Sequence, residues 1–565
     1  MKRLWHIWRE GVIVTGLFSL ASIVMTYPLL FQLNSGLASQ SLDVWILAWD
    51  NWWVQQALST GQNIFYTHLL FFPQGVSLAA HSFSFTHSII SLLFQPFVGS
   101  TAAYNLGILL IFPVSGLGMY LLARHITGSK MAAWLAGLVY AFAPYHMTQA
   151  LGHPHLAYVQ WIPFAILFLL KAIRSQRARN VIFAIIFFTL TAYSGQHLLV
   201  LAFTWVVIFI PLYWLFDRPR WNRAAWLRLG LIITGTIVLS LPLVWPAASD
   251  VLHGQAVQEL QTGDQDNAQT DALAYLIPSR YHPVFGPALA DTYGRLSKNN
   301  NWMPYLGYTA LILSVIGSIA LRRRSLPWVI SGAACIVLAL GTQLRFNGIV
   351  YANVPLPFTL LQNVFPFSFL RSPDRFNVVV SLPLAILAAY GFAALTTKRF
   401  LTRRSALPIS VAVLSALILF EYLNVPYPIM PLPETSPFVT QLAQDPASDA
   451  VLDLPMGRNP SKLYLYWQTL HHQPIVEGHV SRTPAIAYQF IEANALLSAL
   501  RDPGSIELSA PQRSAALHQL AANHIRYILV HIAMSNPDQI KKYHTLIGFD
   551  PIYTDDFVQV YAVAP

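Results

Sequence analysis

Long apolar stretches recur along most of the chain, and short clusters of Lys and Arg close them. An apolar helix of about 17 to 25 residues crosses the hydrocarbon core of a membrane. The pattern therefore predicts an all-α polytopic membrane bundle of about 11 transmembrane helices. The expected helices cover residues 11–31, 102–123, 131–147, 156–173, 181–193, 198–216, 229–245, 305–321, 326–343, 377–395 and 406–422.

Two apolar stretches need a separate interpretation. Basic clusters on both sides of residues 181–216 require the same side of the membrane, so this stretch predicts a hairpin broken at Ser194, Gly195 and Gln196. Segment 89–98 has only about ten residues, which is too short to span. We expect it to be interfacial or re-entrant.

The tail of the chain alternates between strand-like and helix-like patterns. Apolar runs at 450–454, 526–532 and 557–564 predict strands, and residues 485–500, preceded by Pro484, predict a helix. The expected organisation is a transmembrane domain at 1–423, with outer loops 32–101 and 246–304, and a soluble extracytoplasmic α/β domain at 424–565. A domain of this length can bury its own core.

Charge gives the expected orientation. The chain is 55% hydrophobic and 10% charged, with a net charge of +10. Most of its Lys and Arg residues lie in the loops on one side of the expected helices, so the positive-inside rule makes that side cytoplasmic. We expect a multi-pass protein of the plasma (inner) membrane with a cytoplasmic N terminus and an outer C-terminal domain. The sequence has no soluble basic stripe of the kind that binds nucleic acid. Its single cysteine, Cys335, excludes an internal disulfide.

The first outer loop carries two carboxylates in an aromatic segment. Asp43 and Asp50 are two helical turns apart, which places both on one face of a helix. A partly desolvated carboxylate has a raised proton affinity and can act as a base. Alternatively, the Trp residues around them form an ordinary interfacial belt and both Asp side chains face water.

Histidines concentrate on the expected outer side, among them His81, His153 and His155. Imidazoles are common metal ligands, but no carboxylate or cysteine neighbours the His153-Pro154-His155 pair. Two His residues separated by one position point apart unless the proline turn redirects them. The pattern favours hydrogen bonding to a polar substrate over a metal site.

Two arginines, Arg371 and Arg375, lie one helical turn apart just before an expected span. Such a fork can hold a lipid phosphate at headgroup depth through charge-assisted bonds. Equally, the two side chains can extend toward the interface and pair with Asp374 or ordinary headgroups. Both interpretations stand from the sequence.

Several short motifs together resemble the bacterial GT-C class of integral membrane glycosyltransferases, which includes protein mannosyltransferase and aminoarabinose transferase relatives. The motifs are Asp43 after the first span, the basic turn at 121–128, Ala143-Pro144-Tyr145-His146, Gly152-His153-Pro154-His155, Arg371-Ser372-Pro373-Asp374-Arg375-Phe376 and the outer C-terminal domain.

This resemblance implies inverting transfer from a polyprenyl-phosphate-linked sugar to an envelope glycan, lipid or protein. Asp43 would be the base that deprotonates the acceptor hydroxyl, and Arg371 and Arg375 would stabilise the departing phosphate. The substrate-binding residues expected beside the arginines are Asp50, His81, His153 and His155. Position 41 is Ser where many members carry a second acid, so a cofactor or divalent metal is not supported. Membrane lipids are the remaining expected partner.

Two other functions are consistent with a membrane bundle. A lipid or glycolipid flippase typically has ionisable residues in mid-span or internal symmetry, and neither pattern is present in the sequence. A catalytically inactive scaffold for envelope assembly would keep the fold and lose the transfer reaction.

Overall fold

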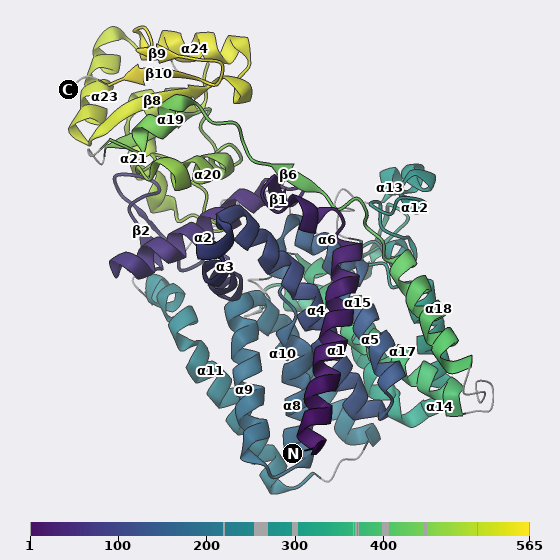
Figure 1. Ribbon diagram of the computed structural model, residues 1–565. Coiled ribbons are helices and arrows are strands. Elements are labelled where there is room, and N and C mark those ends of the chain that lie inside the picture. Colours follow the sequence, from purple (N-terminus) through teal and green to yellow (C-terminus); the bar gives the residue numbers. More distant parts are fainter. Residues whose placement is uncertain are drawn as a thin grey trace. The chain divides into compact units, whose positions relative to one another are not determined.

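The computed structural model describes residues 2–217, 221–252, 269–296, 303–364, 367, 370, 372–397, 406–445, 449–504 and 507–563 (Figure 1). The chain divides into two compact units. We name residues 1–40, 84–241 and 263–430 the helical unit, and residues 41–83, 242–262 and 431–565 the sheet unit. The expected division at residue 424 stays a prediction.

The helical unit is a bundle of apolar helices. Among the described residues, five helical stretches are long and apolar enough to cross a membrane: Ser100–Thr127, Pro154–Arg174, Gln196–Phe216, Arg223–Asp250 and Pro373–Thr396. The full expected count of eleven stays a prediction. The α-helices of this unit are α1 Lys2–Met25, α3 Phe85–Val98, α4 Ser100–Thr127, α5 Lys130–Ala141, α6 Pro144–Gly152, α7 Pro154–Ala157, α8 Trp161–Arg174, α9 Ala178–Ser194, α10 Gln196–Asp217, α11 Arg223–Leu252, α12 Phe285–Ala288, α13 Ala290–Arg295, α14 Tyr308–Leu321, α15 Leu326–Ala339, α16 Phe358–Leu361, α17 Asn377–Thr397 and α18 Ala406–Glu421, with α11 continuing into residues of the sheet unit.

Local sequence explains where several of these helices end. The predicted break in the hairpin is confirmed, since α9 ends at Ser194 and α10 begins at Gln196. The expected helix 131–147 is wrong as one continuous element: α5 ends at Ala141, because Pro144 holds the residue before it in an extended conformation and begins α6. The expected helix 229–245 is too short, since α11 continues past Pro246 to Leu252.

Two glycines bring α14 and α17 into close contact. A Cβ at Gly391 would lie 1.9 Å from the Leu313 carbonyl oxygen, and one at Gly317 would lie 2.4 Å from that of Leu387. Small residues let the backbones of membrane helices approach closely and gain van der Waals contact.

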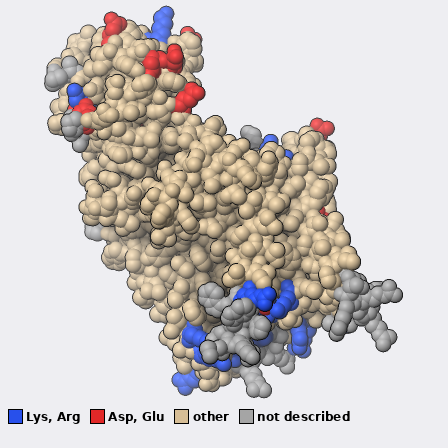
Figure 2. Space-filling view, viewed as in Figure 1, with Lys and Arg blue, Asp and Glu red and all other residues tan. Residues whose placement is uncertain are grey.

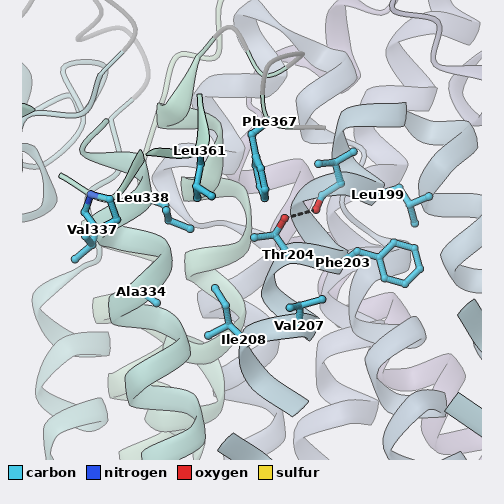
Figure 3. Close-up of a pocket in the computed structure, with 12 residues that line it drawn as sticks. Leu199, Phe203, Thr204, Val207, Ile208, Ala334, Val337, Leu338, Leu361 and Phe367 are labelled. Atoms are coloured by element: carbon cyan, nitrogen blue, oxygen red, sulfur yellow. Dashed lines mark hydrogen bonds between the residues drawn. The ribbon is translucent and has the colours of Figure 1, made fainter. Parts of the chain in front are cut away.

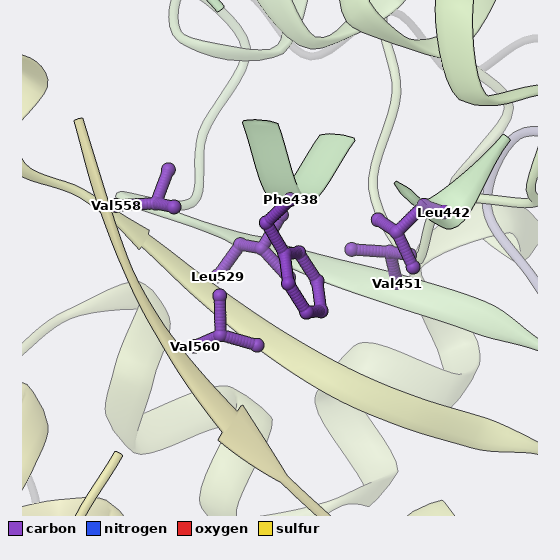
Figure 4. Packing of buried hydrophobic residues seen from close by; sticks show 6 residues of the cluster. All are labelled: Phe438, Leu442, Val451, Leu529, Val558 and Val560. Carbon is purple, nitrogen blue, oxygen red and sulfur yellow. The ribbon is translucent and has the colours of Figure 1, made fainter. Parts of the chain in front are cut away.

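The sheet unit contains a mixed four-stranded sheet in the order β7-β8-β10-β9. Strand β7 (Ala450–Leu454) is parallel to β8 (Ile525–His531), and β10 (Val558–Ala562) is antiparallel to both β8 and β9 (Tyr553–Thr554). The three predicted strands are confirmed. One face of the sheet packs against α19 (Pro437–Leu442) through a core of Phe438, Leu442, Val451, Leu529, Val558 and Val560 (Figure 4).

The remaining elements of the sheet unit are short. The expected helix 485–500 is wrong as one element, because the Asn494 side chain accepts from the Leu496 and Leu497 N–H groups and begins a new helix there. The other helices are α2 Asp43–Thr60, α20 Ser461–His471, α21 Gln489–Ala493, α22 Ala495–Arg501, α23 Ala510–Ala522 and α24 Pro537–Ile547. Two-stranded pairs elsewhere in the chain are β1 Gly36–Ala38 with β6 Ile429–Pro431, β2 Tyr66–Thr67 with β3 Val76–Ser77, and β4 Gln343–Phe346 with β5 Ile349–Pro355.

Helix α2 from the first loop packs on α20 within the sheet unit. The Trp49 indole N–H donates to Gln468 Oε1 at 2.7 Å, and the Trp45 ring contacts Tyr466 at 4.9 Å between centroids. The interpretation of these tryptophans as an interfacial belt is therefore wrong for Trp45, Trp49 and Trp53, which are at most 2% exposed. They form the core that fixes the orientation of the two carboxylates of α2.

Candidate functional site

Asp43 lies at the first residue of α2, where the helix dipole favours a negative charge. Its Oδ1 is 2.6 Å from Lys462 Nζ, near the start of α20, and about a fifth of each side chain is exposed. Residues from the first loop and the tail thus meet in one ion pair. The sequence identified the carboxylate but not the lysine, which is over 400 residues away in the chain.

A second cation and a histidine surround this pair. Arg458 donates to the Ser481 carbonyl and to Thr483 Oγ1, at 3.0 and 3.2 Å. His479 Nδ1 donates to the Arg458 carbonyl at 3.0 Å. Burial, together with the positive charges of Arg458 and Lys462, lowers the pKa of His479 to about 3. The imidazole is therefore neutral at physiological pH.

Asp50, two turns further along α2, has different surroundings. The backbone N–H of Ser481 donates to His81 Nδ1 at 3.0 Å, so in the neutral imidazole Nε2 carries the proton and donates to Asp50 Oδ1 at 2.8 Å. Both side chains are buried, and burial raises the pKa of Asp50 while His81 opposes the shift. The alternative that both carboxylates face water is wrong for Asp50. Its role toward a substrate, like that of His81, stays a prediction.

In the helical unit, three histidines from separate helices meet. His153 caps the C terminus of α6, His155 lies on α7 and His197 lies at the start of α10. Ring centroids are 5.7 Å apart for His153 and His155 and 5.3 Å apart for His155 and His197. The turn at Pro154 brings the His153 and His155 rings into contact. Without such a turn, two residues separated by one position would point apart.

Arg375 joins this histidine cluster. It lies in the 3-10 turn Pro373–Phe376 that precedes α17, and its charge acts on Asp374 and His197. Asp374 is only 9% exposed, so the aspartate of the motif belongs to the interior of the cluster. Arg371 lies outside the described residues, and the predicted arginine fork is therefore represented by Arg375 alone.

Several buried polar atoms point into the same cluster. Within the described part of the chain, no hydrogen bond of ordinary distance and angle reaches the Tyr145 hydroxyl, Gln149 Oε1, His197 Nε2 or Asp374 Oδ1. The Tyr145 hydroxyl lies close enough to Gln149 and Asp374 to interact with both, so these atoms form one buried polar cluster in the helical unit. Sequence reasoning missed Tyr145 and Gln149, although their spacing of four residues on one helix was an available signal.

An apolar groove of about 720 Å³ adjoins this polar cluster. Figure 3 shows side chains of α10 and α15 facing each other across it, with Phe367 and Leu361 at one end. The Thr204 hydroxyl donates to the Val200 carbonyl at 2.8 Å, so even the threonine presents no free donor. The groove begins at Leu199, two residues after His197, and Phe367 contacts the ring of Phe376, the neighbour of Arg375.

This arrangement joins an arginine and histidine cluster to an apolar groove within one unit. An amphiphile with an anionic head and a hydrocarbon chain matches both parts. Among the described residues no group of three His, Cys, Asp or Glu side chains is arranged to hold a metal ion. The expectation from the sequence that a divalent metal is not supported stays a prediction.

Comparison with solved structures shows the same fold in membrane glycosyltransferases of the GT-C class, as the sequence resemblance predicted. A mycobacterial arabinofuranosyltransferase, AftD, aligns over 99% of this chain with a TM-score of 0.57 and 14% identity; the chain spans 40% of its length. The apo oligosaccharyltransferase of Archaeoglobus fulgidus aligns over 95% of this chain and 71% of its own, with a TM-score of 0.52 and 14% identity. Apo ArnT from Cupriavidus metallidurans aligns over 99% and 98%, with a TM-score of 0.52 and 12% identity.

Comparison by sequence gives a family. The profile of a family described as a domain of unknown function, DUF6311, matches residues 17–418. No curated protein matches the sequence.

Proposed function

Because this chain belongs to the DUF6311 family and has the GT-C fold, we propose that it is a membrane glycosyltransferase with a polyprenyl-phosphate-linked sugar donor. The observation that carries the proposal is the apolar groove lined by Phe367, whose ring contacts Phe376 next to Arg375, in the unit that also holds the histidine cluster. The isoprenoid chain would occupy the groove, and the phosphate would bind Arg375 and Arg371. We further propose that the reaction takes place on the extracytoplasmic face of the plasma membrane, with an envelope glycan, lipid or protein as acceptor.

In the proposed reaction, Asp43 removes the proton of the acceptor hydroxyl. The oxygen attacks the anomeric carbon, the bond from that carbon to the phosphate oxygen breaks, and its electron pair leaves with the lipid phosphate. Inversion follows from attack opposite the leaving group. The phosphate leaves as an anion and needs positive charge instead of an acid, which is the role of Arg371 and Arg375.

Lys462 has a consequence for Asp43 in this reaction. The ammonium group 2.6 Å from Oδ1 favours the negative charge of the carboxylate, as a base requires, but it also occupies one of the two oxygens that can accept a proton. Lysine has a long, flexible side chain, and both groups are partly exposed. We propose that the acceptor hydroxyl displaces Lys462 from Asp43 before proton transfer.

The test of the proposed function is transfer of labelled sugar from polyprenyl-phosphate donors in proteoliposomes. We expect Asp43→Asn to lower the rate by about 10²–10⁴-fold, the usual contribution of a general base. The matched control is Asp291→Asn, an exposed aspartate on α13 of the helical unit. Full activity of Asp43→Asn would disprove the base, and absence of transfer by the wild type with every donor would favour a flippase or a scaffold.

A second variant tests the phosphate role. Arg375→Ala should raise the KM for the donor by roughly 10–100-fold, the effect of losing a charged hydrogen bond, with little change for the acceptor. The exposed Arg295→Ala is the control. An equal loss for donor and acceptor would contradict a phosphate contact at this position.

A further inference from the structure

A second cavity, of about 410 Å³, lies among the ends of helices in the helical unit. Its lining residues come from the C-terminal ends of α4 and α8 and from the turn Arg322–Arg324 that follows α14. Residues of α10, α15 and α17 complete the lining. Figure 2 shows Lys and Arg side chains gathered at the end of this unit where Figure 1 places the N terminus. The groove beside Arg375 has no lining residue in common with it.

The charged lining of this cavity is basic. Arg174 and Arg324 line it, together with His125, and Lys171 lies close enough to His125 to act on it electrostatically. No Asp or Glu occurs among its described lining residues. Cations gathered in a concave place without a carboxylate attract an anion, because the low-dielectric walls strengthen the field.

The rest of the lining suits an amphiphile. Arg174 lies over the ring of Tyr213 at 5.5 Å, which fixes the direction of its guanidinium. Trp328 and Tyr390 form another part of the wall, and the remaining lining side chains are mostly aliphatic. Both arginines are exposed, so a headgroup can enter from the surface.

We propose that this cavity binds a phosphate group, with Arg174 and Arg324 as its ligands. Basic pockets between membrane helices bind the phosphates of anionic lipid headgroups. A free phosphate has the same chemistry, and the experiment distinguishes the two sources. The site is separate from the proposed transfer reaction and does not depend on it.

The experiment is a titration of the full-length protein in detergent micelles, followed by native mass spectrometry. The probes are dioleoylphosphatidylglycerol, an uncharged diacylglycerol with the same chains, and inorganic phosphate. Since one arginine near the membrane surface contributes about fivefold, Arg174→Ala with Arg324→Ala should weaken phosphatidylglycerol binding roughly thirtyfold. The matched control, Arg177→Ala with Arg323→Ala, removes two exposed arginines next to the cavity that do not line it; its affinity should stay within twofold of the wild type.

The outcomes separate the possibilities. Competition by millimolar inorganic phosphate supports a phosphate site with a soluble source, and its absence together with phosphatidylglycerol binding supports a lipid source. The double lysine variant, Arg174→Lys with Arg324→Lys, should keep most of the affinity, which excludes misfolding as the cause of a loss. The proposal is overturned if both alanine pairs bind alike, or if diacylglycerol binds as well as phosphatidylglycerol. The arginines would then only compensate the negative ends of the helix dipoles.

Discussion

Asp43 and Asp50 lie on one helix, two turns apart, and yet have opposite surroundings. Asp43 is about a fifth exposed and pairs with a flexible lysine, whereas Asp50 is 2% exposed and accepts from an imidazole whose other nitrogen is held by a backbone N–H. Lys462 reaches Asp43 with a long, flexible side chain and both groups are in contact with solvent, so the lysine can move away and become hydrated. The imidazole cannot move without leaving buried groups unpaired. We infer that the first pair is suited to chemistry and the second to holding the structure.

The variant His81→Ala tests most strongly whether the Asp50–His81 pair holds the structure. Removal of the imidazole leaves the Asp50 carboxylate buried without its partner, which should lower the free energy of unfolding of the sheet unit by about 3–5 kcal/mol. Thermal unfolding in detergent measures the loss. His68→Ala, an exposed histidine of the same segment, is the control and should stay within about 0.5 kcal/mol of the wild type. A similar small effect of both variants would show that the buried pair is not structural.

A smaller effect is expected from Lys462→Met at the other carboxylate. Without the ammonium, Asp43 holds a proton more tightly, so the acid limb of the pH–rate profile should move to higher pH by about one unit. Because the pKa of His479 is about 3, its charge does not change between pH 5 and 8 and does not disturb the measurement. Lys462→Arg should restore the wild-type profile. If the methionine variant keeps that profile as well, Lys462 does not control the charge of Asp43.

The smallest effect is expected from Asp50→Asn, measured as a function of pH. The raised pKa of Asp50 means that the folded protein binds this proton more tightly than the unfolded chain does. The stability that this group contributes is present below the unfolded pKa and falls as pH rises through the folded value. As pH falls toward the unfolded-state pKa, the melting temperature of the wild type should therefore rise relative to that of the variant. Asp538→Asn, on an exposed residue of α24, should show no such trend.

Local patterns predicted much of the fold. The strand at 450–454 and the hairpin break around Gly195 depend on neighbouring residues, and both agree with the structure. Pro144, before which the helix breaks, is part of the motif Ala143-Pro144-Tyr145-His146, but the predicted span 131–147 continues across it. Hydrophobicity alone does not show which proline ends a helix: the helix ends before Pro144, whereas α11 continues through Pro242 and Pro246.

The partners within each site could not be predicted. Lys462 and Ser481 lie about 400 residues beyond Asp43 and His81, and no periodicity connects them. The four buried polar atoms of Tyr145, Gln149, His197 and Asp374 come from three different elements, and only Tyr145 and Asp374 belong to the quoted motifs. The tryptophans of α2 have the composition of a membrane-interface belt, but their burial depends on the distant α20.

The sheet unit is assembled from three separate stretches of chain, which has a consequence for biosynthesis. A ribosome that adds about 5–20 residues per second needs roughly 20–80 s between His81 and Ser481. During that interval Asp43 and Trp49 of the first stretch lack Lys462 and Gln468, their partners in the complete chain. Premature termination would leave these groups uncovered for chaperones and proteases to recognise. Completion of the last stretch thus acts as a checkpoint: no polypeptide that lacks its final quarter can form the Asp43–Lys462 pair or hold the His81 ring through the Ser481 N–H.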